Sequence, residues 1–186
     1  CITVFESVCN VNKRNHRKLA QTITEQPSRF DHLDQMSVAE LLQHINEEDA
    51  RVAEAVRRAI PQIEALVEAI EPRMKRGGRL LYIGAGTSGR LGVLDASELP
   101  PTFGVPETWV IGIIAGGEKA LRQAVEGAED IAEQGWKDLL AYHPTPDDTV
   151  LGIAASGTTP YVVDAIRQAR QNELLTSCIT SNPNTP

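Results

Sequence analysis

The chain has 186 residues, with 18 Lys and Arg against 25 Asp and Glu, so its formal net charge is −7. An ordinary apolar share of 41% excludes a disordered or collagen-like chain. The acidic balance argues against a nucleic-acid partner, and no apolar run approaches the roughly 20 residues that cross a bilayer. Three cysteines at irregular positions predict neither a disulfide framework nor a zinc site, and they favour a reducing, cytoplasmic setting.

Residues 1–22 differ from the rest in charge, because four basic residues stand there against one acidic residue, Glu6. The segment shows no clean helical or strand periodicity. A basic arm or a targeting peptide is the alternative interpretation, but the order of elements in a secretory signal is missing. We expect a flexible or non-native leader, with order beginning near Ile23.

A helical segment is expected over residues 23–78. Ser37 and Glu40 have the spacing of a capping box, in which each side chain bonds the backbone amide of the other residue. Apolar residues at helical spacing then predict three helices, over about 37–45, 47–59 and 62–76. Pro61 is expected to break or kink the second helix, because proline lacks a backbone donor.

The pattern changes over residues 79–186, where four short apolar runs are separated by stretches long enough for helices. The runs are Arg79–Ile83, Trp109–Ile114, Thr149–Ala155 and Leu174–Thr180. Near-continuous apolarity indicates strands buried on both faces, so we predict an α/β fold with a parallel sheet. Such sheets bind ligands beyond the carboxyl ends of their strands, where helix N-termini point amides at anions.

Two of the predicted strands run into small-residue turns that carry hydroxyl side chains. The first turn, 84–89, is formally G-x-G-x-x-G, but a dinucleotide site also needs an acidic residue at the end of the second strand, which here ends in Ala-Gly-Gly. Amides and hydroxyls of such turns bind a phosphate monoester without a metal, and ordinary turns capped by Ser or Thr are the alternative. The residues predicted to bind phosphate are Gly86, Thr87, Ser88, Gly89, Ser156, Gly157, Thr158 and Thr159.

Glu98 is a candidate general acid. A helix entered at Ser88 is expected to stop near Leu99, because Pro100 disfavours a helical residue before it. Glu98 would then lie at the negative end of the helix, close to Asp95, and both neighbours favour its protonated form. A solvated surface glutamate is the alternative.

Glu129 is a candidate general base. A helix is predicted over about 118–134, with an apolar stripe that includes Leu121, Val125 and Ala128. Glu129 lies on the border of this stripe, where a carboxylate can face a cleft, whereas Glu126 points away from it.

Three sequence blocks resemble one family closely. GAGTSGRLGVLDASELPPTFG, IAGGEKALRQAVEGAED and GIAASGTTPYV are similar to the N-acetylmuramic acid 6-phosphate etherases. These belong to the sugar isomerase (SIS) fold group and are related to the glucokinase regulatory protein. The resemblance runs from Ile23 to the end of the chain. It implies a doubly wound parallel sheet of SIS type, in three α/β/α layers, over residues 79–186 as a partial sugar-phosphate-binding domain, preceded by N-terminal helices.

The resemblance also implies a function. It is that of a cytoplasmic lyase of cell-wall amino sugar recycling, which cleaves the D-lactyl ether of N-acetylmuramic acid 6-phosphate to N-acetylglucosamine 6-phosphate and D-lactate. Elimination is followed by water addition, with Glu98 as the acid and Glu129 as the base. No cofactor or metal is implied. The family is homodimeric, and its sites draw on both subunits.

Two departures from the family bear on these expectations. Many members have Arg where this chain has Thr158, and the family continues well beyond Pro186. We therefore expect a truncated chain with an unpaired sheet edge and little or no activity. A non-catalytic sugar-phosphate-binding regulatory protein, similar to the glucokinase regulatory protein, and a ketose–aldose isomerase are the alternative functions.

Overall fold

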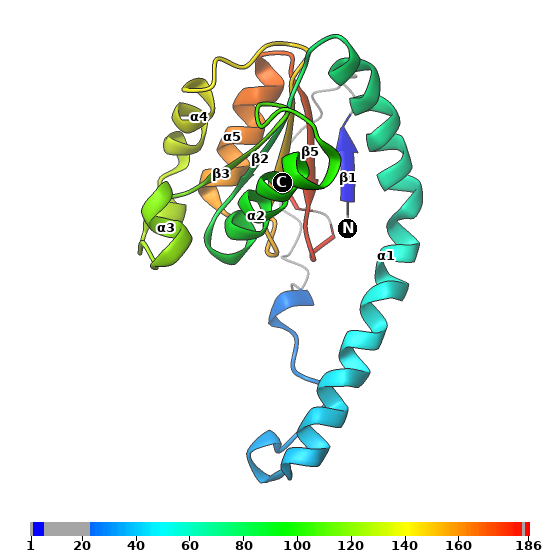
Figure 1. Ribbon diagram of the computed structural model, residues 1–186. Helices are drawn as coiled ribbons and strands as arrows, with labels where there is room; N and C mark the ends of the chain where they lie inside the picture. Colours follow the sequence, from blue (N-terminus) through cyan, green and yellow to red (C-terminus); the bar gives the residue numbers. More distant parts are fainter. Residues whose placement is uncertain (1, 6–22, 184) are drawn as a thin grey trace, which may run out of the picture.

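The computed structural model describes residues 2–5, 23–183 and 185–186. Four of its strands are parallel neighbours: β2 (Leu80–Gly84), β3 (Val110–Ile114), β4 (Thr149–Ile153) and β5 (Leu175–Ile179). They coincide with the four predicted apolar runs, so the predicted parallel sheet is confirmed. The sheet order is β1-β5-β4-β2-β3 (Figure 1). The chain moves from β2 to β3 on one side and then to β4 on the other, which makes the carboxyl ends of β2 and β4 a topological switch point.

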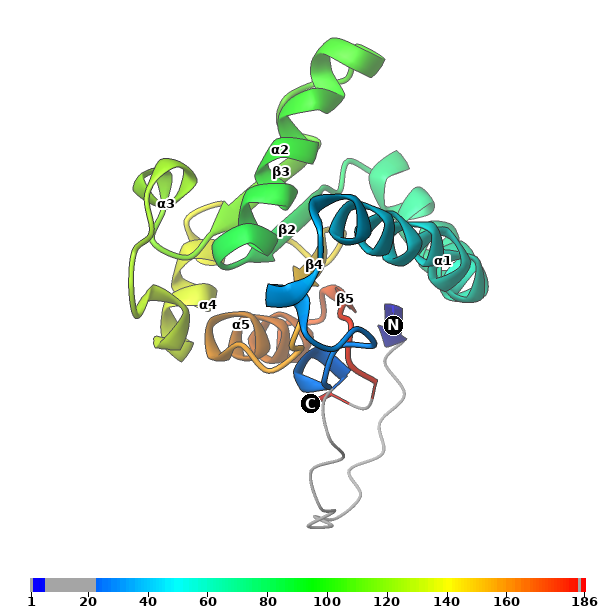
Figure 2. The ribbon, with the colours of Figure 1, turned by 90° about the horizontal axis from the view of Figure 1, so that it is seen from below.

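Helices cover both faces of this sheet, as Figure 2 shows. On one face lies α2 (Gly86–Phe103), and on the other lie α4 (Ala132–Leu140) and α5 (Pro160–Gln171). The core between the sheet and the helices α4 and α5 contains fully buried residues, among them Leu81, Ile83, Leu139, Val150, Tyr161 and Ala165. Burial of such side chains contributes about 1.5–3 kcal/mol each for the large aliphatic ones.

Close packing of α2 depends on glycine. A Cβ on Gly112 of β3 would lie 2.5 Å from Cα of Val93, and a Cβ on Gly92 would lie 3.1 Å from Cβ of Tyr82. These contacts bring the helix backbone close to β2 and β3.

Of the break or kink predicted at Pro61, the break is wrong. One helix, α1, runs from Val38 to Lys75 and contains both Pro61 and Pro72. Its start agrees with the prediction, because Ser37 and Glu40 form both bonds of the capping box. A proline removes one helical donor, and in a helix of 38 residues the other bonds keep the turns before and after it in place. Two short 3-10 turns, η1 (Ile23–Glu25) and η2 (Leu33–Gln35), precede it.

Most apolar side chains of α1 do not pack against the rest of the described chain. The first half of the helix extends beyond the sheet (Figure 1). Seven large aliphatic residues of α1 are at least half exposed: Val38, Leu42, Ile45, Val52, Val56, Ile60 and Val67. Leu66 is the buried residue of the helix, at 6% exposure.

The expected unpaired edge at β5 is also wrong. A strand of the first segment, β1 (Ile2–Phe5), pairs antiparallel with β5, from Ile2 opposite Ile179 to Phe5 opposite Thr176. The backbone groups at this edge of β5 therefore have partners, which come from a segment without clean strand periodicity in its sequence. Residues 6–22 of the predicted leader lie outside the described residues.

The predicted helix over 118–134 is divided. A short helix, α3 (Glu118–Arg122), is followed by the 3-10 turn η3 (Ala128–Asp130) and then by α4. Gly127 separates them in the left-handed region, with φ of 73°, which glycine adopts without steric cost. None of the helices among the described residues is long and apolar enough to cross a membrane.

Candidate functional site

The two turns predicted to bind phosphate begin side by side. β2 and β4 are paired so that Gly84 lies opposite Ile153, and each strand runs from there into its turn. Both turns therefore lie at the switch point of the sheet, where doubly wound proteins bind ligands.

The turn after β2 is shaped by its glycines. Gly86 has φ of 52°, and a Cβ on Gly84 would lie 2.8 Å from Cα of Gly89, so backbone approaches backbone there. Gly86 and Thr87 are exposed, Ser88 is half-buried and Gly89 is buried. Ala85 provides no side-chain cap for α2, and the first amides of a helix have no intrahelical acceptor. This turn therefore offers free N–H donors and the Thr87 hydroxyl.

The turn after β4 is stabilised by a hydrogen bond within the turn. Gly157 has φ of 70°, and the Oγ of Ser156 accepts a hydrogen bond from the amide of Thr158 at 3.2 Å. Thr158 is exposed, and Thr159 is the N-cap of α5, with Pro160 in its first turn.

Asn182 provides much of this support, and sequence reasoning missed it. Its side chain is buried, and its Nδ2 donates to the carbonyl of Ser156 at 3.0 Å and to Oγ1 of Thr24 at 3.0 Å. The amide of Thr24 donates back to Oδ1 of Asn182. The turn is thus fixed by the segment after β5 and by η1, through contacts between residues too far apart in sequence for spacing to reveal.

Glu129 lines a pocket of about 210 Å³, which we call the Glu129 pocket. One wall is the start of α2 and the other is the loop around η3. Its lining residues are Ala85, Gly86, Thr87, Arg90, Ala115, Ala120, Ala124, Val125, Glu126, Gly127, Ala128 and Glu129. Glu129 and Glu126 are both exposed and both line this cleft, so the expected contrast between them, with Glu126 pointing away, is wrong. The loop around η3 places them there rather than a helix border. The turn after β4 does not line this pocket.

Within one chain, Glu98 lies far from the Glu129 pocket. It follows Gly86 by twelve residues on α2, which is roughly 18 Å along a helix axis. The expected helix end at Leu99 is wrong, because α2 continues through Pro100 and Pro101 to Phe103. These prolines occupy the last turn, where freed carbonyls can be hydrated, so the lost bonds cost less than in a helix interior. Glu98 therefore does not sit at a helix terminus.

The surface around Glu98 is apolar. Leu91 and Leu94 are each 57% exposed, and they lie seven and four residues before Glu98, on the same side of α2. Nearby, the hydroxyl of Tyr82 donates to Asp95 at 2.8 Å, which fixes this part of α2 over β2. Burial, together with the Asp95 carboxylate, raises the pKa of Tyr82. Glu98 thus projects from an exposed apolar helix face.

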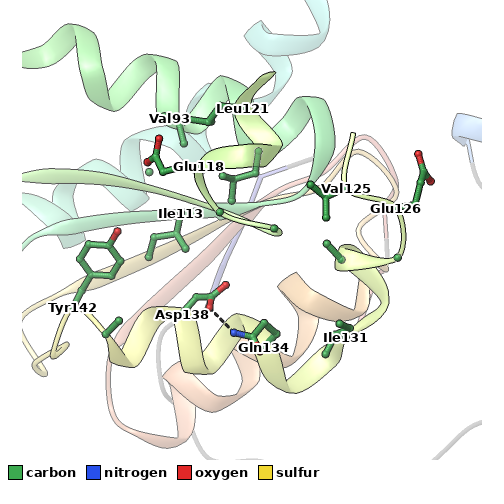
Figure 3. A pocket seen from close by; sticks show the side chains of 17 residues that line it. Val93, Ile113, Glu118, Leu121, Val125, Glu126, Ile131, Gln134, Asp138 and Tyr142 are labelled. Carbon is green, nitrogen blue, oxygen red and sulfur yellow. Dashed lines mark hydrogen bonds between the residues drawn. The ribbon is translucent and has the colours of Figure 1, made fainter. Parts of the chain in front are cut away.

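A larger pocket of about 640 Å³ lies beside the Glu129 pocket, along β3 (Figure 3). Glu118 and Leu121 come from α3, and Gln134 and Asp138 from α4. The Asp138 carboxylate is already engaged, because it accepts from Nε2 of Gln134 and from the hydroxyl of buried Tyr161, both at 2.7 Å. Burial, followed by this contact with Asp138, raises the pKa of Tyr161.

The Asp138–Tyr161 contact joins α4 to the first turn of α5. It therefore fixes the helix that follows η3 relative to the helix that follows the Ser156 turn. Within the described residues, no group of three or more His, Cys, Asp or Glu is placed to hold a metal ion.

The sequence of this chain is similar to those of known proteins. A protein from Bacteroides thetaiotaomicron named N-acetylmuramic acid 6-phosphate etherase is 65% identical over 164 residues, covering 88% of this chain and 59% of that protein. One of the same name from Porphyromonas gingivalis is 63% identical over 166 residues, covering 89% and 61%. The chain spans about three fifths of the length of these curated relatives.

Among solved structures, a phosphoheptose isomerase from Francisella tularensis matches with a TM-score of 0.62 and 23% identity, over 78% of this chain and 76% of that one. At this identity the likeness concerns the fold. The family model described as "Glucokinase regulatory protein N-terminal SIS domain" matches residues 62–170, which include the sheet from β2 to β4, the Glu129 pocket and both turns. The chain belongs to this SIS-domain family.

Proposed function

We propose that the chain belongs to a lyase that cleaves the D-lactyl ether of N-acetylmuramic acid 6-phosphate. The observation that carries the proposal is Glu129, which opens into a pocket beside the turn after β2. Relatives that are 52–65% identical and bear the etherase name support the assignment. The proposal includes a cytoplasmic location, which rests on these metabolic relatives rather than on a structural feature.

The two turns supply the anion site. The first amides of α2 with Thr87, and the Ser156 to Thr159 turn, offer N–H and hydroxyl donors at one end of the sheet. A phosphate monoester of an open-chain sugar is a suitable ligand, since these groups bind it without a metal.

Two carboxyl groups carry the chemistry. Glu129 removes the proton from C2, which the neighbouring aldehyde acidifies, and the electron pair forms a C2–C3 double bond. The C3–O bond breaks, and the lactyl oxygen takes a proton from Glu98. Water then adds, with its hydroxyl to C3 and a proton to C2, giving N-acetylglucosamine 6-phosphate and D-lactate. Each proton transfer is worth about 10²–10⁴-fold in rate.

Because one chain does not bring Glu98 to the Glu129 pocket, we propose a homodimer in which a second copy supplies it. Leu91 and Leu94 beside Glu98, each 57% exposed, give this face an apolar surface that a partner would bury. The exposed aliphatic residues of α1 provide a second such surface. Isologous contact would form two equal sites.

Lactate release tests the function in a chain completed to the length of its relatives. We expect Glu98→Gln and Glu129→Gln each to lower the rate by about 10²–10⁴-fold. Glu133→Gln, an exposed change on α4, serves as the control and should keep the wild-type rate. Full activity of either glutamine variant removes that residue from the mechanism. Ligand binding by the wild type without lactate release would favour the regulatory protein instead.

A further inference from the structure

Arg90 is a cation in the Glu129 pocket that the mechanism above does not use. It lies in the second turn of α2 and is half-buried. Its Nε donates to the carbonyl of Ala120 in α3 at 2.9 Å. This bond fixes the plane of the guanidinium group, because Nε and the two terminal nitrogens are coplanar.

The terminal nitrogens of Arg90 remain available. Over the part of the chain that the structure describes, no ion pair or hydrogen bond is assigned to Nη1 or Nη2. Two carboxylates, Glu126 and Glu129, line the same pocket, yet neither is within ion-pair distance of Arg90. Among the residues that the structure describes, no other Lys or Arg lines the pocket. An oriented guanidinium with two free donors matches the geometry of a carboxylate or a phosphate, which it binds with two parallel hydrogen bonds.

We propose that Arg90 binds the lactyl carboxylate of the substrate, a role that rests on the function proposed above. The substrate has two anionic groups, a carboxylate on the C3 substituent and a phosphate on C6. Glu129 acts at C2, next to C3, and shares its pocket with Arg90. The hydroxyl-rich turn at Ser156 to Thr159 lies outside this pocket, where it is available for the distant phosphate. Arg90 therefore recognises the group that distinguishes substrate from the amino sugar product.

The test compares two ligands on the 186-residue chain by titration calorimetry, in a Glu98→Gln background that prevents turnover. We expect Arg90→Met to weaken binding of N-acetylmuramic acid 6-phosphate by about 10- to 100-fold. Binding of N-acetylglucosamine 6-phosphate, which has no lactyl group, should change by less than about twofold. Arg90→Lys should give an intermediate loss of affinity, because Lys keeps the positive charge but cannot make two parallel hydrogen bonds to a carboxylate. Arg122→Met, an exposed cation of neighbouring α3, is the matched control and should change neither affinity.

A ligand-side measurement removes the dependence on folding of the variants. A substrate analogue with a lactamide in place of the carboxylate should bind the Arg90-containing chain about 10- to 100-fold more weakly than the acid does.

Equal losses for both sugar phosphates in Arg90→Met would overturn the proposal and assign Arg90 to the phosphate. No loss in the variant, or equal affinity for acid and amide, would leave Arg90 as a clamp between α2 and α3. If the affinity ratios are as expected but the wild-type chain completed to the length of its relatives releases no lactate, the lyase is rejected and the Arg90 assignment is kept. Binding of neither sugar phosphate would overturn both.

Discussion

Arg79, at the amino end of the sheet, and Arg90, at the carboxyl end, are engaged very differently. Nε and Nη2 of Arg79 both donate to the buried carboxylate of Asp148, at 3.0 and 2.7 Å. Arg90 uses Nε alone, on a backbone carbonyl. The first arginine has an internal anion as its partner, and the second has donors left for an external one. The amino end of the sheet is therefore expected to contribute stability, and the carboxyl end to bind and transform the ligand.

The largest expected effect concerns the division of the site between copies. When the completed Glu98→Gln and Glu129→Gln chains, each nearly inactive, are unfolded together and refolded, mixed dimers should form. One of the two sites in each mixed dimer then has both glutamates, so about a quarter of the wild-type lactate release should return. Each variant refolded alone is the control. If the mixture stays as inactive as its components, both glutamates act within one chain, and the carboxyl end forms a complete site without a partner.

The next largest effect tests the amino end. Asp148→Asn leaves the half-buried Arg79 without its anion, and we expect the free energy of unfolding to fall by about 2–3 kcal/mol in urea titrations. Affinity for N-acetylglucosamine 6-phosphate should not change. Asp147→Asn is a matched control, because Asp147 pairs with Arg76 at 2.6 Å but both side chains are about half exposed, and such a pair contributes less than about 1 kcal/mol. A change in affinity upon Asp148→Asn would contradict the division of roles between the two ends.

The same pair predicts a pH dependence. Burial favours a raised pKa for Asp148, but the hydrogen bonds from Arg79 and from the amides of Thr145 and Arg79 outweigh it and hold the pKa below its usual value. The carboxylate therefore stabilises the fold above its unfolded pKa of about 3.9, and this contribution is lost as the pH falls through the lower folded value. Urea midpoints measured from pH 6 downward should fall more steeply in the wild type than in Asp148→Asn. Parallel curves would show that another group controls acid unfolding.

The smallest effect concerns a buried contact on the carboxyl side. Tyr161→Phe removes the hydroxyl that donates to Asp138, while the Gln134 bond to Asp138 remains. We expect a loss of about 1–1.5 kcal/mol in the free energy of unfolding, less than for Asp148→Asn. Tyr142→Phe, at a position 40% exposed, should stay within about 0.5 kcal/mol of the wild type. A loss upon Tyr161→Phe equal to that of Asp148→Asn would remove the difference in stability between the two ends.

The four parallel strands could be predicted because strands buried on both faces read as continuous apolar runs. The capping box at Ser37 and Glu40 was predictable for a similar reason, since both of its partners lie within one turn. Helix continuity was not. Rules about single prolines predicted a break or kink at Pro61 and a helix end before Pro100, whereas α1 and α2 continue through them.

The candidate site was predictable only in part. The composition of the turns after β2 and β4, rich in glycine and hydroxyl side chains, predicted them as anion-binding turns, and Glu129 was expected in a cleft. The left-handed Gly127 that carries Glu129 into the pocket was overlooked, although its sequence, Glu-Gly-Ala, is a signal for a helix interruption. Arg90 and Asn182 gave no local signal, because their importance comes from contacts with segments far away in sequence.

Asn182 makes the amide of Thr24 a reporter of the distant Ser156 turn. One carboxamide bonds both, so Ser156 cannot move without altering the bond that protects the Thr24 N–H. Exchange of that single proton with deuterium would therefore slow when a phosphate immobilises the turn and quicken when the turn opens. The occupancy of the turn could thus be followed at the Thr24 amide without labelling the ligand.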